Sequence, residues 1–148
     1  MNKLLIAGIA CIGLAGSAPA AAGLLSSTGE VIAIMAGELF TGTAEGHLNG
    51  AGTISIHSQK TPGLTCSGQF TSSAELGGKG KLACSDGSSA TIKFKRLTIY
   101  RGHGTGRFSR GPMSFTYGLT AGEAAPYLKL PKGKKLVHNG KELALVDL

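Results

Sequence analysis

The chain is poor in aromatic residues: it has no tryptophan, five phenylalanines and three tyrosines among 148 residues. Aromatic side chains supply much of the apolar area that a protein core buries, so the sequence predicts a small hydrophobic core. Acidic residues are also few, with eight Asp or Glu against fifteen Lys or Arg. They are widely separated along the chain, and this spacing does not favour the paired carboxylates of a glycoside hydrolase.

Motifs of catalysis and cofactor binding are missing as well. Neither GxxxxGK[ST] nor GxGxxG occurs, and the nucleophile motif GxSxG is absent. The four histidines show no HxH or HExxH spacing, and there is no CxxC pair that could hold zinc. We therefore predict a protein that is not an enzyme, with no catalytic residues, no cofactor and no metal.

The longest apolar run lies at the N-terminus and is short. Lys3 precedes an uncharged stretch, residues 4–14, and the small residues of 17–22 follow. This order predicts a secretory signal peptide over residues 1–22, because the apolar part is too short to span a bilayer as a permanent helix. The mature chain would be a single secreted β domain, residues 23–148, periplasmic or secreted and without a transmembrane helix.

The three cysteines divide between these two parts. Cys11 follows Gly8-Ile9-Ala10, as in a lipid-attachment site, but Gly8 stands where a large aliphatic residue is usual, so we expect no lipid anchor. Cys66 and Cys84 remain in the mature chain, and in an oxidising compartment an even count predicts a disulfide. Closing a loop of this size stabilises the fold by about 3 kcal/mol in the chain-entropy model.

Glycine recurs at every second position in three segments, 42–46, 78–80 and 102–106, with Ala44 in the middle of the first. A period of two is that of a β-strand, in which alternate side chains share one face. Each segment is followed by a turn signal and a strand of alternating apolar residues, which predicts three hairpins. We expect the glycines to leave room for bulky side chains on neighbouring strands.

Setting small residues opposite bulky ones predicts the registers, because a slip of one residue would turn a strand inside out. Loops at 49–51, 86–88 and 110–111 satisfy this rule. If Cys66 and Cys84 are direct cross-strand neighbours, they fix a fourth register. The predicted pairs are Gly46 with Ile54, Gly80 with Phe94, Gly104 with Tyr117, and Phe70 with Gly80.

These patterns predict an all-β fold, a small antiparallel barrel or sandwich of about seven to nine short strands. Residues 24–39 fit either a strand or a helix by periodicity. Thr120 and Glu123 have the spacing of a capping box and predict one short helix near residues 121–128. Asn139-Gly140 predicts a C-terminal hairpin.

Charge is distributed unevenly along the chain. From Lys79 to the end there are thirteen Lys or Arg against four Asp or Glu, a balance of +9, whereas residues 23–78 carry −3. Lys93 and Lys95 alternate with apolar residues, which places cations on the solvated face of a strand. Export argues against nucleic acid as the partner. We predict a surface for an anionic envelope component (lipid headgroup, lipopolysaccharide or acidic glycan) or for another protein, formed by Lys93, Lys95, Arg101, Arg107 and Arg110.

Several segments carry a resemblance: TGTAEG, the SG after Cys66, GKGKLACSDG, and GHGTG followed by SFTYG. Together they resemble a loose group of short exported bacterial β-domain proteins of unknown function, over residues 40–118. The resemblance implies export and fold but supplies no catalytic residues. Small periplasmic lysozyme inhibitors are similar in architecture, but this chain has only Lys132-Gly133 of their motifs and no SGxxY.

The sequence thus favours a non-catalytic, exported, envelope-associated or binding module with a basic surface. One alternative is a small periplasmic hydrolase or metal-dependent enzyme that uses Glu45, His47 and His57, which share the outer face of a predicted hairpin. Another is an inhibitor-like or structural barrel.

Overall fold

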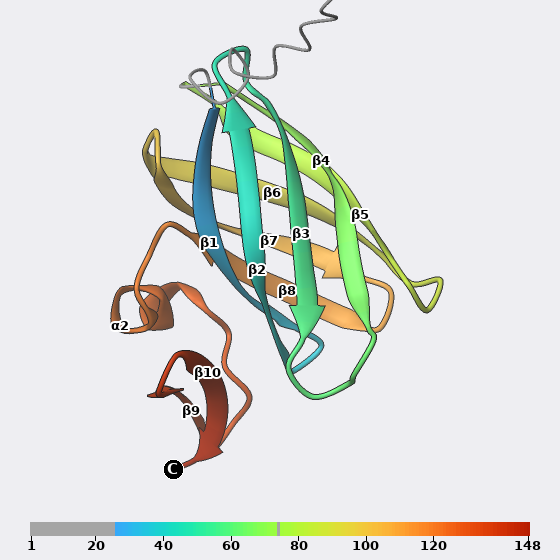
Figure 1. Ribbon diagram of the computed structural model, residues 1–148, viewed down its shortest axis with the longest axis vertical. Helices are drawn as coiled ribbons and strands as arrows, with labels where there is room; N and C mark the ends of the chain where they lie inside the picture. The colour runs from blue at the N-terminus through green and yellow to red at the C-terminus, as the bar shows by residue number, and fades with distance from the viewer. Residues whose placement is uncertain (1–25, 74) are drawn as a thin grey trace, which may run out of the picture.

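The computed structural model describes residues 26–73 and 75–148. The predicted signal peptide, residues 1–22, and Cys11 lie outside these residues. The described chain is mostly β-structure, as the alternating sequence patterns predict (Figure 1). Within the segment that fitted either a strand or a helix, residues 26–39 contain the first strand and the start of the second.

Eight consecutive antiparallel strands close into a barrel, because β8 pairs back with β1. Each strand also pairs with the next one along the chain. The predicted barrel is therefore confirmed, with the last strand covering the edge that the first would otherwise expose. The strands are β1 (Ser26–Met35), β2 (Glu38–His47), β3 (Ala51–Ser58), β4 (Thr65–Ser73), β5 (Gly77–Cys84), β6 (Ser89–Thr98), β7 (Arg101–Phe108) and β8 (Gly111–Tyr117).

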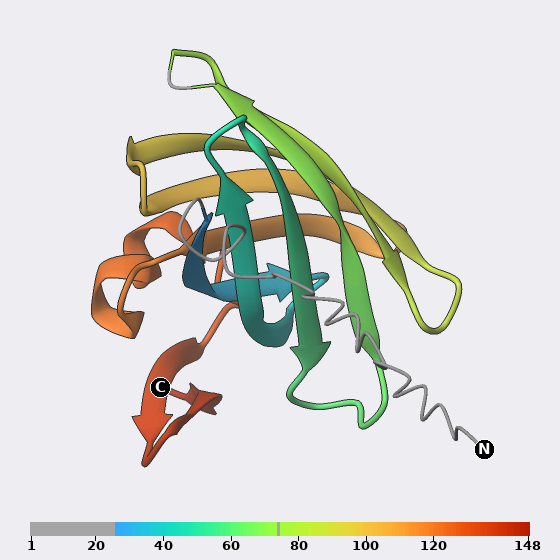
Figure 2. The ribbon, with the colours of Figure 1, turned by 45° about the horizontal axis from the view of Figure 1, so that its top comes forward.

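The C-terminal segment covers one side of the barrel, beside β1 (Figures 1 and 2). It contains α2 (Ala121–Ala124), the 3-10 turn η1 (Ala125–Tyr127), β9 (Lys134–Asn139) and β10 (Glu142–Asp147). The predicted short helix and terminal hairpin are thus present. β1 is apolar on both faces, and its outward side chains form a second core with this segment. That core contains Ile32, Ile34, Leu39, Leu119, Ala124 and Leu128.

The strand faces are as predicted, but three of the four predicted registers are wrong by two residues. Cys66 pairs directly with Cys84, and Phe70 lies opposite Gly80, as expected. The other hairpins turn at different residues: the first turn, for example, is closed by the Gly50 N–H donating to the His47 carbonyl. A slip of two keeps every side chain on its face, so the pairing rule could not detect it. The observed partners are Ala44 for Ile54, Gly78 for Phe94 and Gly102 for Tyr117.

The inward glycines seat aromatic rings, as the sequence suggested. A Cβ atom built on Gly104 would lie 2.7 Å from Phe115 Cζ, closer than carbon atoms can approach without displacement. The same holds for three other pairs along the barrel wall. They are Gly52 beneath Phe70, Gly78 beneath Phe94 and Gly102 beneath Tyr117.

The Phe94 ring is the centre of the aromatic cluster inside the barrel. It meets the Phe70, Tyr117 and Phe115 rings edge to face, with centroids 5.5, 5.7 and 6.3 Å away. Edge-to-face contact at these distances is favourable beyond the apolar area buried.

A capping box begins α2 and ties it to the barrel. The Glu123 N–H donates to Thr120 Oγ1 at 3.3 Å, and the Thr120 N–H donates to a Glu123 carboxylate oxygen at 3.2 Å. Arg101 on β7 forms an ion pair with the same carboxylate. The Arg101 hydrogen bond, followed by the Thr120 N–H, holds the pKa of Glu123 below its ordinary value.

This lowered pKa predicts how the C-terminal segment responds to acid. Because the folded pKa lies below the unfolded one, the stabilisation is present above the unfolded pKa of about 4.3 and is lost as pH falls through the folded pKa. An NMR titration of the Glu123 carboxyl carbon should show this lowered midpoint. Arg101→Gln should raise the midpoint toward the ordinary value, and an unchanged midpoint in this variant would contradict the ion pair.

Candidate functional site

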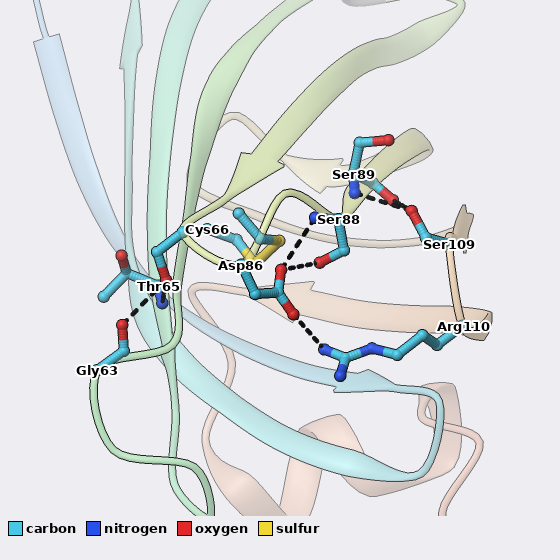
Figure 3. The surroundings of a disulfide bond; sticks show 10 residues. Gly63, Thr65, Cys66, Asp86, Ser88, Ser89, Ser109 and Arg110 are labelled. Atoms are coloured by element: carbon cyan, nitrogen blue, oxygen red, sulfur yellow. Dashed lines mark hydrogen bonds and ion pairs between the residues drawn. A yellow bond between two sulfur atoms is a disulfide. The ribbon is translucent and has the colours of Figure 1, made fainter.

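One end of the barrel is filled by side chains and the disulfide. Met35, Phe40 and Cys66 are fully buried there. The Cys66–Cys84 bond lies beside the turn between β5 and β6, where Asp86 accepts a hydrogen bond from the Ser88 N–H at 2.9 Å (Figure 3). Hydrogen bonds from Ser88, together with the Arg110 charge, lower the pKa of Asp86. We call it the sealed end, because buried side chains fill it.

The other end, which we call the mouth, contains a cavity. The mouth is the end where β1 begins and where the turns after β2, β4 and β6 lie (Figures 1 and 2). The cavity has a volume of about 240 Å³. Eight-stranded barrels have interiors just wide enough to be filled by side chains or to hold one small ligand. The apolar side chains that line the mouth cavity include Val31, Ile54, Ile92, Phe94 and Phe115.

Arg96 extends from β6 into this cavity. It lies two residues beyond the inward Phe94, on the same strand face, and is half-buried. Its guanidinium donates to Ser72 Oγ at 2.9 Å. The ion pairs found among residues 26–73 and 75–148 do not include Arg96. The cavity therefore combines an apolar wall with one cation.

Tyr117 lines the same cavity from β8. Burial raises the pKa of its hydroxyl, and the nearby Arg96 charge opposes this shift only in part. The hydroxyl is therefore protonated at neutral pH and can donate a hydrogen bond.

Cations gather on the outer face of β5, β6 and β7. Lys93, Lys95 and Arg107, which the sequence placed on this surface, all point outward and are exposed. Lys79 lies directly opposite Lys93, and Lys81 lies opposite Thr91. The two β5 lysines were not among the predicted surface residues, although their alternation with small and apolar residues in GKGKL is the same signal. We call Lys79, Lys81, Lys93, Lys95 and Arg107 the basic face.

Two residues predicted for the anionic-partner surface, Arg101 and Arg110, lie outside the basic face, because each forms an ion pair with a residue distant in sequence. Arg101 is paired with Glu123 at the start of α2. Arg110 lies in the turn between β7 and β8 at the sealed end, where it approaches Asp86 at 3.1 Å and covers the Phe108 ring (Figure 3). Neither is free to join the basic face.

The alternative enzyme site is not assembled. His57 on β3 lies opposite Thr41 on β2. Glu45 on β2 lies opposite Thr53, which is four residues before His57 on β3. At about 3.4 Å per residue, this separates the His57 and Glu45 positions by roughly 14 Å. No group of three metal-ligating side chains occurs within the described residues. The three side chains share a face, as predicted, but form no common site.

Large exposed apolar side chains concentrate at the mouth. Of seven such residues in the described chain, five lie in or beside the turns after β2, β4 and β6, and they are Leu48, Leu76, Leu97, Ile99 and Tyr100. Leu48, Ile99 and Tyr100 also line the cavity. Neither the cavity nor this apolar rim was predicted from the sequence. The available signal for the rim was the presence of apolar residues in turns: Leu48 before Asn49-Gly50, Leu76 before Gly77, and the Ile99-Tyr100 pair.

Comparisons with protein-family models, curated proteins and solved structures find no match for this chain. No helix in the described part of the chain is long and apolar enough to cross a membrane. The described chain is a small closed antiparallel barrel with a cavity at one end.

Proposed function

We propose that this chain is an exported, non-catalytic binding module that docks on an anionic lipid surface through its mouth. The observation that carries the proposal is the clustering of exposed apolar side chains at three mouth turns beside the basic face. Export rests on the N-terminal signal pattern. Single exposed apolar residues are ordinary on a protein surface, but the gathering of five of the seven large ones at one end of the described barrel favours an interaction site there.

The charges next to the rim favour lipid over other partners. Leu76 lines a shallow groove with Lys79, Lys93 and Lys95, so cations lie directly beside an apolar turn. Facing lysines on adjacent strands repel one another, and no acidic residue lines this groove. An anionic headgroup layer relieves this repulsion while the apolar turns enter the acyl boundary. An acidic glycan would use the cations but leave the apolar rim in water.

The proposal predicts that Lys79→Ala with Lys95→Ala weakens binding to anionic vesicles. Each lysine near an anionic surface contributes about 1 kcal/mol, so the double variant should bind roughly 30-fold more weakly at low salt. Binding is measured by co-sedimentation with phosphatidylglycerol-containing vesicles at two salt concentrations. Lys132→Ala with Lys141→Ala removes the same charge from the exposed C-terminal region and should bind as the parent does.

A variant of the apolar rim distinguishes docking on lipid from charge attraction alone. Leu76→Ser with Ile99→Ser should weaken vesicle binding even at high salt, because the apolar contribution is not screened. Two results would overturn lipid docking. One is equally tight binding to a soluble acidic polysaccharide and to vesicles, and the other is vesicle binding that the rim variant leaves unchanged.

A further inference from the structure

The mouth cavity has the chemistry of a ligand site of its own, and the rim residues Leu48, Ile99 and Tyr100 border it. Its wall is formed by aliphatic and aromatic side chains from β1, β3, β6 and β8. A cavity of about 240 Å³ has room for a short aliphatic chain. Polar side chains of Ser26, Ser27, Thr28 and Ser72 also line the cavity, so a ligand with both an apolar part and a polar part suits it.

The Arg96 guanidinium at the cavity indicates which polar head group a ligand would carry. The Arg96 guanidinium has five N–H donors, and within residues 26–73 and 75–148 one of them donates to a side chain, that of Ser72. A half-buried guanidinium is expensive to desolvate unless an anion accepts its bonds. The Tyr117 hydroxyl, seated over Gly102, adds a neutral donor to the cavity. A carboxylate or phosphate oxygen matches these donors.

We propose that the mouth cavity binds a single-chain anionic amphiphile, with its acidic head at Arg96 and its aliphatic chain among Phe94, Phe115 and Ile54. The site needs no vesicle, because a monomeric ligand in solution reaches the same cavity. Docking on lipid would bring the mouth to a source of such molecules, but binding does not depend on it.

The test uses octanoate as the probe and the mature oxidised protein. Isothermal titration calorimetry should show one site for octanoate. 1-Octanol, which has the same chain without the charge, should bind at least tenfold more weakly. Arg96→Gln should reduce octanoate affinity at least tenfold and leave 1-octanol affinity nearly unchanged. Equal affinities for octanoate and 1-octanol in the parent protein would overturn the assignment of the head to Arg96.

A cavity-filling variant tests the chain-binding half. A Cβ atom on Gly46 meets only the Phe70 ring, at 3.9 Å, and Gly46 lines the cavity, so a larger side chain can enter without a backbone clash. Gly46→Leu should keep the parent's thermal midpoint within a few degrees and lose octanoate binding. Gly46→Ala is the matched milder variant and should retain most of the affinity.

Two results would contradict the proposal: no octanoate binding by the folded parent protein, or undiminished binding by folded Gly46→Leu. Lys79→Ala with Lys95→Ala should bind octanoate as the parent does. The cavity and the lipid-docking surface can therefore fail separately.

Discussion

Replacing Gly68 by alanine should destabilise the barrel by about 3 kcal/mol, the upper end of what overpacking a core costs. A Cβ atom at this position would lie 2.8 Å from the Lys81 carbonyl carbon and 2.9 Å from Leu82 Cα, and closer still to the Lys81 oxygen. All three atoms belong to the backbone of β5, which is paired with β4. They cannot move away as a flexible side chain would, so β4 and β5 must separate to admit a single methyl group.

The matched control is Gly122→Ala, in α2, where an added Cβ atom meets nothing within 4 Å. Alanine is the better helix former, so this variant should keep or gain stability, by up to about 1 kcal/mol. Urea unfolding of both variants measures the difference. An unfolding free energy for Gly68→Ala within 1 kcal/mol of the parent's would contradict the close approach of the two strands.

Removing the disulfide should have an effect of similar size. Cys66 and Cys84 are separated by 18 positions in sequence, and opening a loop of this length lowers stability by about 3 kcal/mol in the chain-entropy model. For a domain of this size that corresponds to a fall of roughly 12 °C in the thermal midpoint. The loss matters because the aromatic core is small.

The double variant Cys66→Ala with Cys84→Ala is compared with the parent protein, each with and without a thiol reductant. Reduction should lower the midpoint of the parent toward that of the variant and leave the variant unchanged. A parent whose midpoint does not respond to full reduction would show that the bond contributes no stability.

The registers show how far alternation of residues constrains a sheet. Small and bulky residues at every second position assigned the inner and outer faces of the barrel strands correctly. The β4–β5 register was predicted correctly because a covalent bond between Cys66 and Cys84 defines it. The predicted registers of the other three hairpins were wrong by two residues. The register of a hairpin depends on which turn residue adopts a positive φ, as Gly50 and Gly87 do. Composition alone does not show which glycine of a turn takes that conformation.

The site residues show the same limit. Alternation along β6 placed Lys93 and Lys95 outward, and the same rule would have placed Arg96 inside the barrel had it been applied one residue further. Arg101 and Arg110 could not be assigned in this way. Their ion-pair partners, Glu123 and Asp86, come from other parts of the chain and meet them only after folding.

By itself, the sequence determined the strands from residue 40 onward, their two faces, the cysteine pair and the capped turn before the C-terminal hairpin, whereas residues 24–39 fitted either a strand or a helix. These depend on neighbours within a strand or a hairpin. Only the tertiary structure decided that β8 closes on β1, that the C-terminal segment covers their outer face, and that the empty volume lies at the mouth. The physical reason is that closure and internal volume depend on contacts between strands far apart in the chain, which no local pattern specifies.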